Sequence, residues 1–146
     1  MNLSKRGKVT RVINATAAGT DDVTGATIDM KGFDAVTFIV GFGAITSGAA
    51  TSIKAQGGAA SNLSDAADLL GTSITVADDD DNQVAVLEIV NPRERYIRVI
   101  VDRGTQNAVV DFGIAIQTSA KNEPVTHDSS TVVSAEVHHA PAEGTA

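Results

Sequence analysis

The stretch AVTFIVGF, residues 35–42, decides the fold of this chain. Its large apolar side chains recur at every second position: Val36, Phe38, Val40 and Phe42. A period of two residues places these side chains on one face of an extended strand, with Thr37, Ile39 and Gly41 on the other face. The stretch therefore predicts a central β-strand that turns one face to the core.

Further strand-like segments surround this one, separated by turn residues. We expect them at Val9–Ile13, Val23–Met30, Thr51–Gln56, Gln83–Val90, Arg95–Asp102 and Ala108–Thr118. Between them, Ser61–Leu70 departs from the alternation and predicts a brief helix or a tight loop. Short, regularly spaced strands without long helices are typical of an all-β fold, here an antiparallel β-sandwich of jelly-roll type with extended terminal arms. Eight side chains are predicted to be buried: Val36, Phe38, Val40, Ile97, Val99, Phe112, Ile114 and Ile116.

Charge and composition divide the chain into three parts. Residues 1–12 form a basic N-terminal arm, residues 13–120 the sandwich body, and residues 121–146 an extended C-terminal tail with a possible edge strand at Thr131–Val137. The net charge is −7, whereas the arm carries four basic and no acidic side chains. Ordering such arms costs ~1–2 kcal/mol per residue with little burial to offset it, so we expect neighbouring subunits to hold them.

Several partner classes fit the composition poorly. The longest apolar stretch, residues 35–44, is shorter than the ~20 residues that span a bilayer, and no secretion signal opens the chain, so we expect a soluble protein with no membrane partner. An acidic body with one Tyr, four Phe and no Trp predicts no nucleic-acid partner. Without cysteine, disulfides and thiol chemistry are excluded.

Four short motifs contain residue types that carry chemistry, and none has the required spacing. The acidic run Asp78–Asp81 could hold a cation but lacks the calcium-loop pattern, and a solvated turn explains it better. The run His127-Asp128-Ser129 is contiguous, whereas a hydrolase triad assembles from separate elements. The neighbours His138 and His139 lack a third ligand, and Gly41-Phe42-Gly43 ends a strand instead of opening a helix. We expect no catalytic, cofactor-binding or metal-binding residues, no cofactor, and no enzymatic activity.

The strand at residues 95–102 offers a candidate protein interface. Alternation places Ile97, Val99 and Val101 inward with Arg95, and Tyr96 and Arg98 outward. Tyr and Arg are favoured at protein interfaces, although Arg98 could equally pair across the sheet while Tyr96 covers its edge. The candidate partner-binding residues are Lys5, Arg6, Lys8, Arg11, Tyr96 and Arg98.

Three segments resemble small structural proteins of tailed-phage virions: GFDAVTFIVGFGAIT at 32–46, DLLGTSITVADDDDNQV at 68–84 and RERYIRVIVDRGTQNAVVDFGIAIQ at 93–117. The resemblance implies a capsid cement or decoration protein of jelly-roll type, made in the host cytoplasm and located on the capsid surface of the virion. Such a protein is a homo-oligomer that binds the outside of the shell and bridges major capsid protein subunits. The alternatives are another head or tail structural role, such as head completion, or a carbohydrate-binding module, for which Tyr96 alone offers an aromatic platform.

Overall fold

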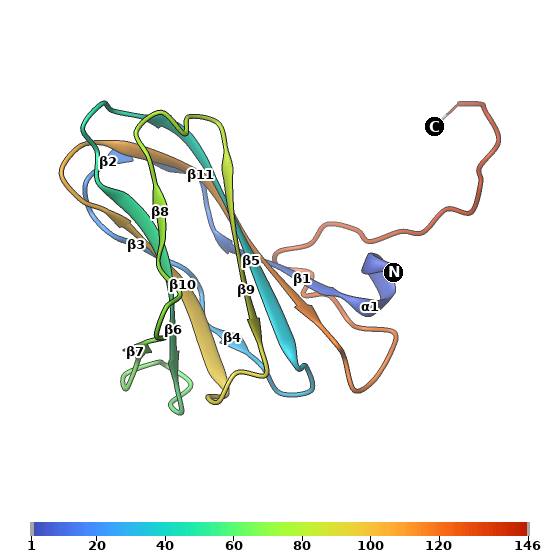
Figure 1. Cartoon of the computed structure of the whole chain (residues 1–146). Coiled ribbons are helices and arrows are strands. Elements are labelled where there is room, and N and C mark those ends of the chain that lie inside the picture. The colour runs from blue at the N-terminus through green and yellow to red at the C-terminus, as the bar shows by residue number, and fades with distance from the viewer. Residues whose placement is uncertain (1, 146) are drawn as a thin grey trace.

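The computed structural model describes residues 2–145 and consists of two antiparallel β-sheets packed face to face (Figure 1). The predicted all-β sandwich is confirmed. Its elements in chain order are α1 (Leu3–Arg6), β1 (Lys8–Ile13), β2 (Thr16–Gly19), β3 (Val23–Thr24), β4 (Ile28–Asp29), β5 (Ala35–Ile45), β6 (Thr51–Gly58), β7 (Ala67–Asp68), β8 (Ile74–Val76), β9 (Val84–Val90), β10 (Tyr96–Arg103) and β11 (Ala108–Thr118).

Each sheet is named here after its central strand. The β5 sheet has the order β1-β11-β5-β9, and β2 also pairs with β11. The β10 sheet has the order β3-β10-β6-β7, with β4 pairing with β10 and β8 with β6. All strand pairs are antiparallel, and the chain repeatedly crosses between the two sheets, which brings its β-branched residues to both sides of one core.

The core lies between the sheets and follows the predicted alternation on β5 and β10. Val36, Phe38 and Val40 are completely buried, as are Ile97, Val99 and Val101 from the opposite sheet. Small residues on β11 make room for the large ones on β5, because Ala115 lies opposite Phe38 and Gly113 lies opposite Val40. Large side chains facing small ones allow a pleated core to close without voids.

The predicted burial of Phe112, Ile114 and Ile116 is wrong. The register between β11 and β5 shifts between Ala108 and Val110 and again between Val110 and Phe112. An inserted residue at a bulge reverses which side chains face inward. After the shift Gly113, Ala115 and Gln117 point to the core, and the three large residues are half-buried on the outside.

Other segments differ from the sequence expectation in detail. Residues 61–66 form tight turns, the second of the two predicted alternatives, and Ala67–Asp68 form the short strand β7. The Asp65 carboxylate accepts hydrogen bonds from the backbone N–H groups of Ala59 and Ala60 in these turns. The strand β2, Thr16–Gly19, lies between two of the predicted strands and was not predicted. The expected edge strand Thr131–Val137 is not a strand, since its backbone pairs with no neighbouring strand in the described chain.

The two ends of the chain contact each other, and part of the N-terminal arm pairs with the body, whereas the sequence predicted that neighbouring subunits hold both arms. The arm boundary at residue 12 falls inside β1, which pairs with β11 and buries Val12 and Ile13. Arg6 Nε lies 2.9 Å from Glu123 Oε2, and Val125 N–H donates to Lys5 C=O at 2.8 Å. Residues 8–12 are ordered by their pairing with β11 along one side of the strand, so they need no neighbouring subunit for order.

Candidate binding surface

The outward face of the β5 sheet carries large apolar side chains in register. Val86, Ile39 and Ile114 form one row across β9, β5 and β11. In the next row Val84 lies opposite Gly41, which lies opposite Phe112. We call this surface the outer apolar face, formed by Ile39, Val84, Val86, Phe112, Ile114 and Ile116.

Gly41 shapes the centre of the outer apolar face. A methyl group at this position would collide with the ring of Phe112, which therefore covers the Gly41 backbone. Thr37 separates Glu88 from Ile116 in the third row, and Leu3 of α1 joins Glu88 and Ile116 around a hollow at that end. The face is thus apolar in its middle and polar at one end.

Exposure distinguishes this face from an ordinary sheet surface. Val84 and Val86 remain 56% and 54% exposed, and Val90 on the same strand is exposed as well. Soluble proteins rarely expose contiguous apolar patches, and those that occur commonly mark interaction sites. The arrangement can bury apolar area against another protein.

The outward face of the β10 sheet has the opposite character. Arg98 Nε and Nη2 donate to Gln56 Oε1 at 2.9 and 2.7 Å, and Gln56 Nε2 donates to Asp68 Oδ1 at 2.7 Å. Lys54 Nζ also reaches Asp68 at 2.7 Å, and its hydrogen bond lowers the pKa of the Asp68 carboxyl. This face satisfies its polar groups within the chain and suits contact with water.

The structure does not bring the candidate partner-binding residues together. Tyr96 and Arg98 lie on the β10 sheet, with the Arg95 guanidinium carbon 5.0 Å from the centre of the Tyr96 ring. The candidates on β1 and α1 lie at the far edge of the β5 sheet. Arg98 pairs across the sheet, as one of its two interpretations expected, although with Gln56 and not with an acid. Arg95 was expected inward and is exposed.

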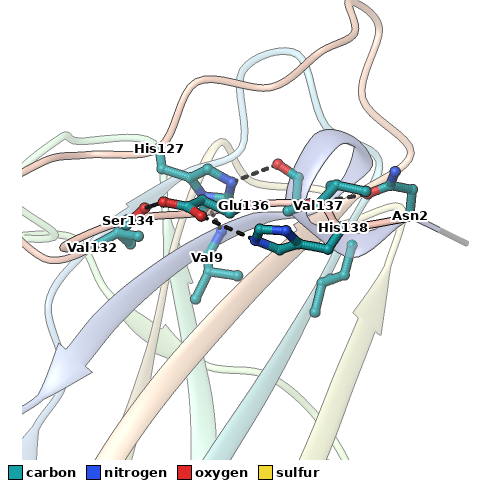
Figure 2. Close-up of a pocket in the computed structure, with 11 residues that line it drawn as sticks. Asn2, Val9, His127, Val132, Ser134, Glu136, Val137 and His138 are labelled. Atoms are coloured by element: carbon teal, nitrogen blue, oxygen red, sulfur yellow. Dashed lines mark hydrogen bonds and ion pairs between the residues drawn. The ribbon is translucent and has the colours of Figure 1, made fainter. Parts of the chain in front are cut away.

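The N-terminal segment and the C-terminal tail enclose a groove beside β1 (Figure 2). His127 stands at its base, where Nδ1 accepts a hydrogen bond from Val9 N–H at 3.2 Å. Its Nε2 lies 2.9 Å from Ser4 C=O, which assigns the proton to Nε2. Val132 and Val137 line the groove with Val9. The imidazole therefore fastens the tail to the edge of the sheet.

The hydrolase-type run does not assemble into a triad. Asp128 Oδ1 accepts hydrogen bonds from Ser130 N–H and Ser130 Oγ–H at 2.8 and 2.7 Å. These bonds lower the pKa of the Asp128 carboxyl. Since the His127 imidazole is occupied by Val9 and Ser4, the two side chains act separately, and both stabilise local backbone.

The acidic run forms a turn whose carboxylates bind backbone. Asp81 Oδ1 accepts from Ile45 N–H and Asp78 Oδ2 from Gly48 N–H, both at 2.6 Å. Asp80 Oδ2 accepts from Ala77 N–H at 2.9 Å. These contacts tie the turn before β9 to the end of β5. Across residues 2–145, no three His, Asp or Glu side chains gather as a metal-binding group.

The outer apolar face was missed by sequence reasoning because three of its six residues, Phe112, Ile114 and Ile116, were placed in the core. The available signal was the small-residue positions Gly113 and Ala115, which alternate with Phe112, Ile114 and Ile116. Either set of alternate residues on β11, the large ones or the small ones, could face the core, and only the bulge determines which set does.

The chain was compared with protein-family models and with curated proteins. No protein-family model matches the chain, and no curated protein matches it. Among the helices of the described residues, none has the length and apolar character needed to cross a membrane.

Proposed function

We propose that this chain is a structural subunit that binds other protein subunits through the outer apolar face. More specifically, we propose a cement or decoration protein on the outside of a tailed-phage capsid, where it bridges major capsid protein subunits. The observation that carries the proposal is the contiguous, partly exposed apolar surface in the middle of the β5 sheet. The resemblance of residues 32–46, 68–84 and 93–117 to phage virion proteins supports the choice of partner.

The proposed mechanism is passive. Each apolar side chain removed from water at a subunit joint stabilises the assembled shell, and binding to the assembled state shifts the equilibrium toward it by mass action. A sheet face with its apolar side chains in adjacent rows suits this task, because it presents area without a moving part. The polar face of the β10 sheet would then point to solvent.

Substitution of Ile114 tests which face binds. Ile114→Thr keeps a β-branched side chain on β11 and removes apolar area from the centre of the face. The matched control is Leu70→Thr, since Leu70 is fully exposed and lies between β7 and β8 on the other sheet. Both variants would be incubated with capsids assembled from the major capsid protein of the same phage, and occupancy would be measured by mass spectrometry.

We expect Ile114→Thr to weaken attachment about 10- to 100-fold, the factor that corresponds to burying one such side chain. The Leu70→Thr protein should attach normally, and both should melt near the wild-type temperature. Attachment of Ile114→Thr at wild-type affinity would refute the binding face, and no attachment of the wild-type protein to capsids would refute the cement role.

A further inference from the structure

One long sheet edge of this molecule is bare. The β5 sheet ends at strand β9. Strand β9 pairs with strand β5 without a register shift over seven residue pairs, from Val84 to Val90. In the described part of the chain no strand pairs with the other side of β9. The strand contains no Pro, no Lys and no bulge, which are the features that usually protect an edge.

The edge at β1 and the edges of the β10 sheet are protected. At the opposite edge of the same sheet, β1 has a bulge between Arg11 and Ile13, and the His127 imidazole covers Val9 N–H. The β10 sheet ends in the short strands β3, β4, β7 and β8, which have two or three residues each. Short strands offer few unpaired backbone groups, so β9 stands out as a site for another strand.

The C-terminal tail contains a strand sequence that lacks a sheet. Residues 131–137 read TVVSAEV, with Val133, Ala135 and Val137 at alternate positions. The segment has seven residues, as many as β9. Val133 is fully exposed, and the backbone of the segment joins no strand in the part of the chain that the structure describes.

We propose that residues 131–137 of one copy add to β9 of a second copy as an extra strand. Such addition satisfies the backbone of both segments by a strand ladder. It also extends the outer apolar face, because Val133, Ala135 and Val137 would share the side of Val84 and Val86. Each segment has a single Glu, at positions 88 and 136. Glu88 shares the face of Val84 and Val86, whereas Glu136 lies on the face opposite to Ala135 and Val137, so the two carboxylates would be on different faces of the ladder.

The partner must be a second copy because the tail cannot reach its own β9. His127 is fastened beside β1, and the four residues to Thr131 span at most ~14 Å. A strand beyond β9 lies four strand spacings from β1, or ~19 Å. The turn in which Thr131 and Val132 N–H groups donate to Asp128 C=O shortens the reach further.

This inference extends the proposed function by naming the contact between copies, and its test uses no capsid. The chain has no cysteine, so introduced thiols are the only ones present. Full-length Val86→Cys protein and isotopically labelled Ala135→Cys protein would be mixed and treated with a short bismaleimide. Leu70→Cys mixed with Ala135→Cys is the matched control, because Leu70 lies on the other sheet.

We expect dimers that join position 86 of one copy to position 135 of the other, at least tenfold above the control pair. Links between two 86 positions would show pairing of β9 with itself and would overturn the proposal. So would an internal link within one chain carrying both thiols, or equal yields in the control.

A proline pair tests the same ladder without thiols. Successive backbone N–H groups of a strand point to opposite sides, so one proline of Val133→Pro/Ser134→Pro removes a ladder donor in any register. The control is Ala142→Pro/Glu143→Pro, further along the tail. We expect the dissociation constant for self-association, measured by light scattering, to rise at least tenfold only for the first variant, with unchanged melting.

Unchanged self-association of that variant, or a wild-type chain that is monomeric at its highest soluble concentration, would overturn strand exchange. These results would not decide the cement role, because that role is tested separately by the attachment of the wild-type and Ile114→Thr proteins to capsids.

Discussion

At the scale of single residues, the buried guanidinium of Arg103 links several backbone segments at one end of the sandwich. Arg103 is 5% exposed and takes the inward parity of β10 that Ile97, Val99 and Val101 share. Its guanidinium donates to the carbonyl oxygens of Ala17 and Asp21 at 2.7 Å each and to that of Ala108 at 2.9 Å. A buried charge needs such partners, and these bonds tie β2 and its loop to β11.

A surface ion pair at the other end of β10 predicts a dependence on pH. Arg95 Nε and Nη2 donate to the two oxygens of Asp29 at 2.8 Å each, which lowers the pKa of Asp29 to about 2. Because the folded-state pKa lies below the unfolded value of ~3.9, the contribution is present above pH ~4 and is lost as the pH falls toward 2. Asp29→Asn should therefore melt slightly below wild type at neutral pH, and the difference should shrink on acidification.

Thermal melting of both proteins between pH 7 and 2 would measure this effect, which solvent screening keeps small. Asp79→Asn is the control, since Asp79 is an exposed carboxylate and Arg95 pairs with Asp29 instead. Parallel melting curves for Asp29→Asn and wild type would contradict a role for the pair.

At the scale of elements, the two edges of the β5 sheet differ in what covers their backbone groups. At β1 the His127 imidazole ties the tail to the body. It accepts a hydrogen bond from Val9 N–H of β1 and donates one to Ser4 C=O of α1. At β9 the register with β5 continues to the end of the strand, and no second strand pairs with β9 among residues 2–145. A single side chain thus protects one edge and sets where the tail leaves the body.

His127→Ala should release the tail while leaving the sandwich folded. The change removes the acceptor of Val9 N–H and the donor to Ser4 C=O, both at an edge that water can reach. We expect faster hydrogen exchange at Val9 and faster proteolysis of residues 125–137, with nearly unchanged melting. His138→Ala is the control, because the His138 imidazole hydrogen-bonds the exposed Glu136 carboxylate of its own tail and not the backbone of β1 or α1. Equal exchange at Val9 in His127→Ala and wild type would show that the imidazole does not hold the tail.

At the scale of the whole molecule, the two sheets share one core and present opposite outer surfaces. The outer surface of the β10 sheet is polar and internally paired, whereas that of the β5 sheet is apolar in its middle. A sandwich with water on both sides would be polar on both outer faces. The asymmetry is what points to a partner on the β5 side.

Truncation of the central aromatic residue should destabilise the whole sandwich. Phe38 is completely buried and lies opposite Ala115 and Leu87 in its own sheet. Phe38→Ala should lower the free energy of unfolding by ~3–5 kcal/mol, because the small neighbours cannot fill the cavity. Chemical denaturation would measure the loss, with Leu70→Ala as the exposed control. A loss below ~1 kcal/mol would contradict the position of Phe38 at the centre of the core.

The sequence by itself determined the class of fold, because a period of two residues around Phe38 and Val99 admits only strands with one buried side. It also predicted most strands to within a few residues. Only the tertiary structure decided which side of β11 is buried, since Phe112, Ile114 and Ile116 alternate equally well in either register and a bulge selects the outward one. It likewise decided that Arg6 meets Glu123, a contact between residues 117 positions apart that no local pattern encodes. Periodicity is a local property of the chain, whereas register and long-range pairing depend on which neighbours the folded sheet supplies.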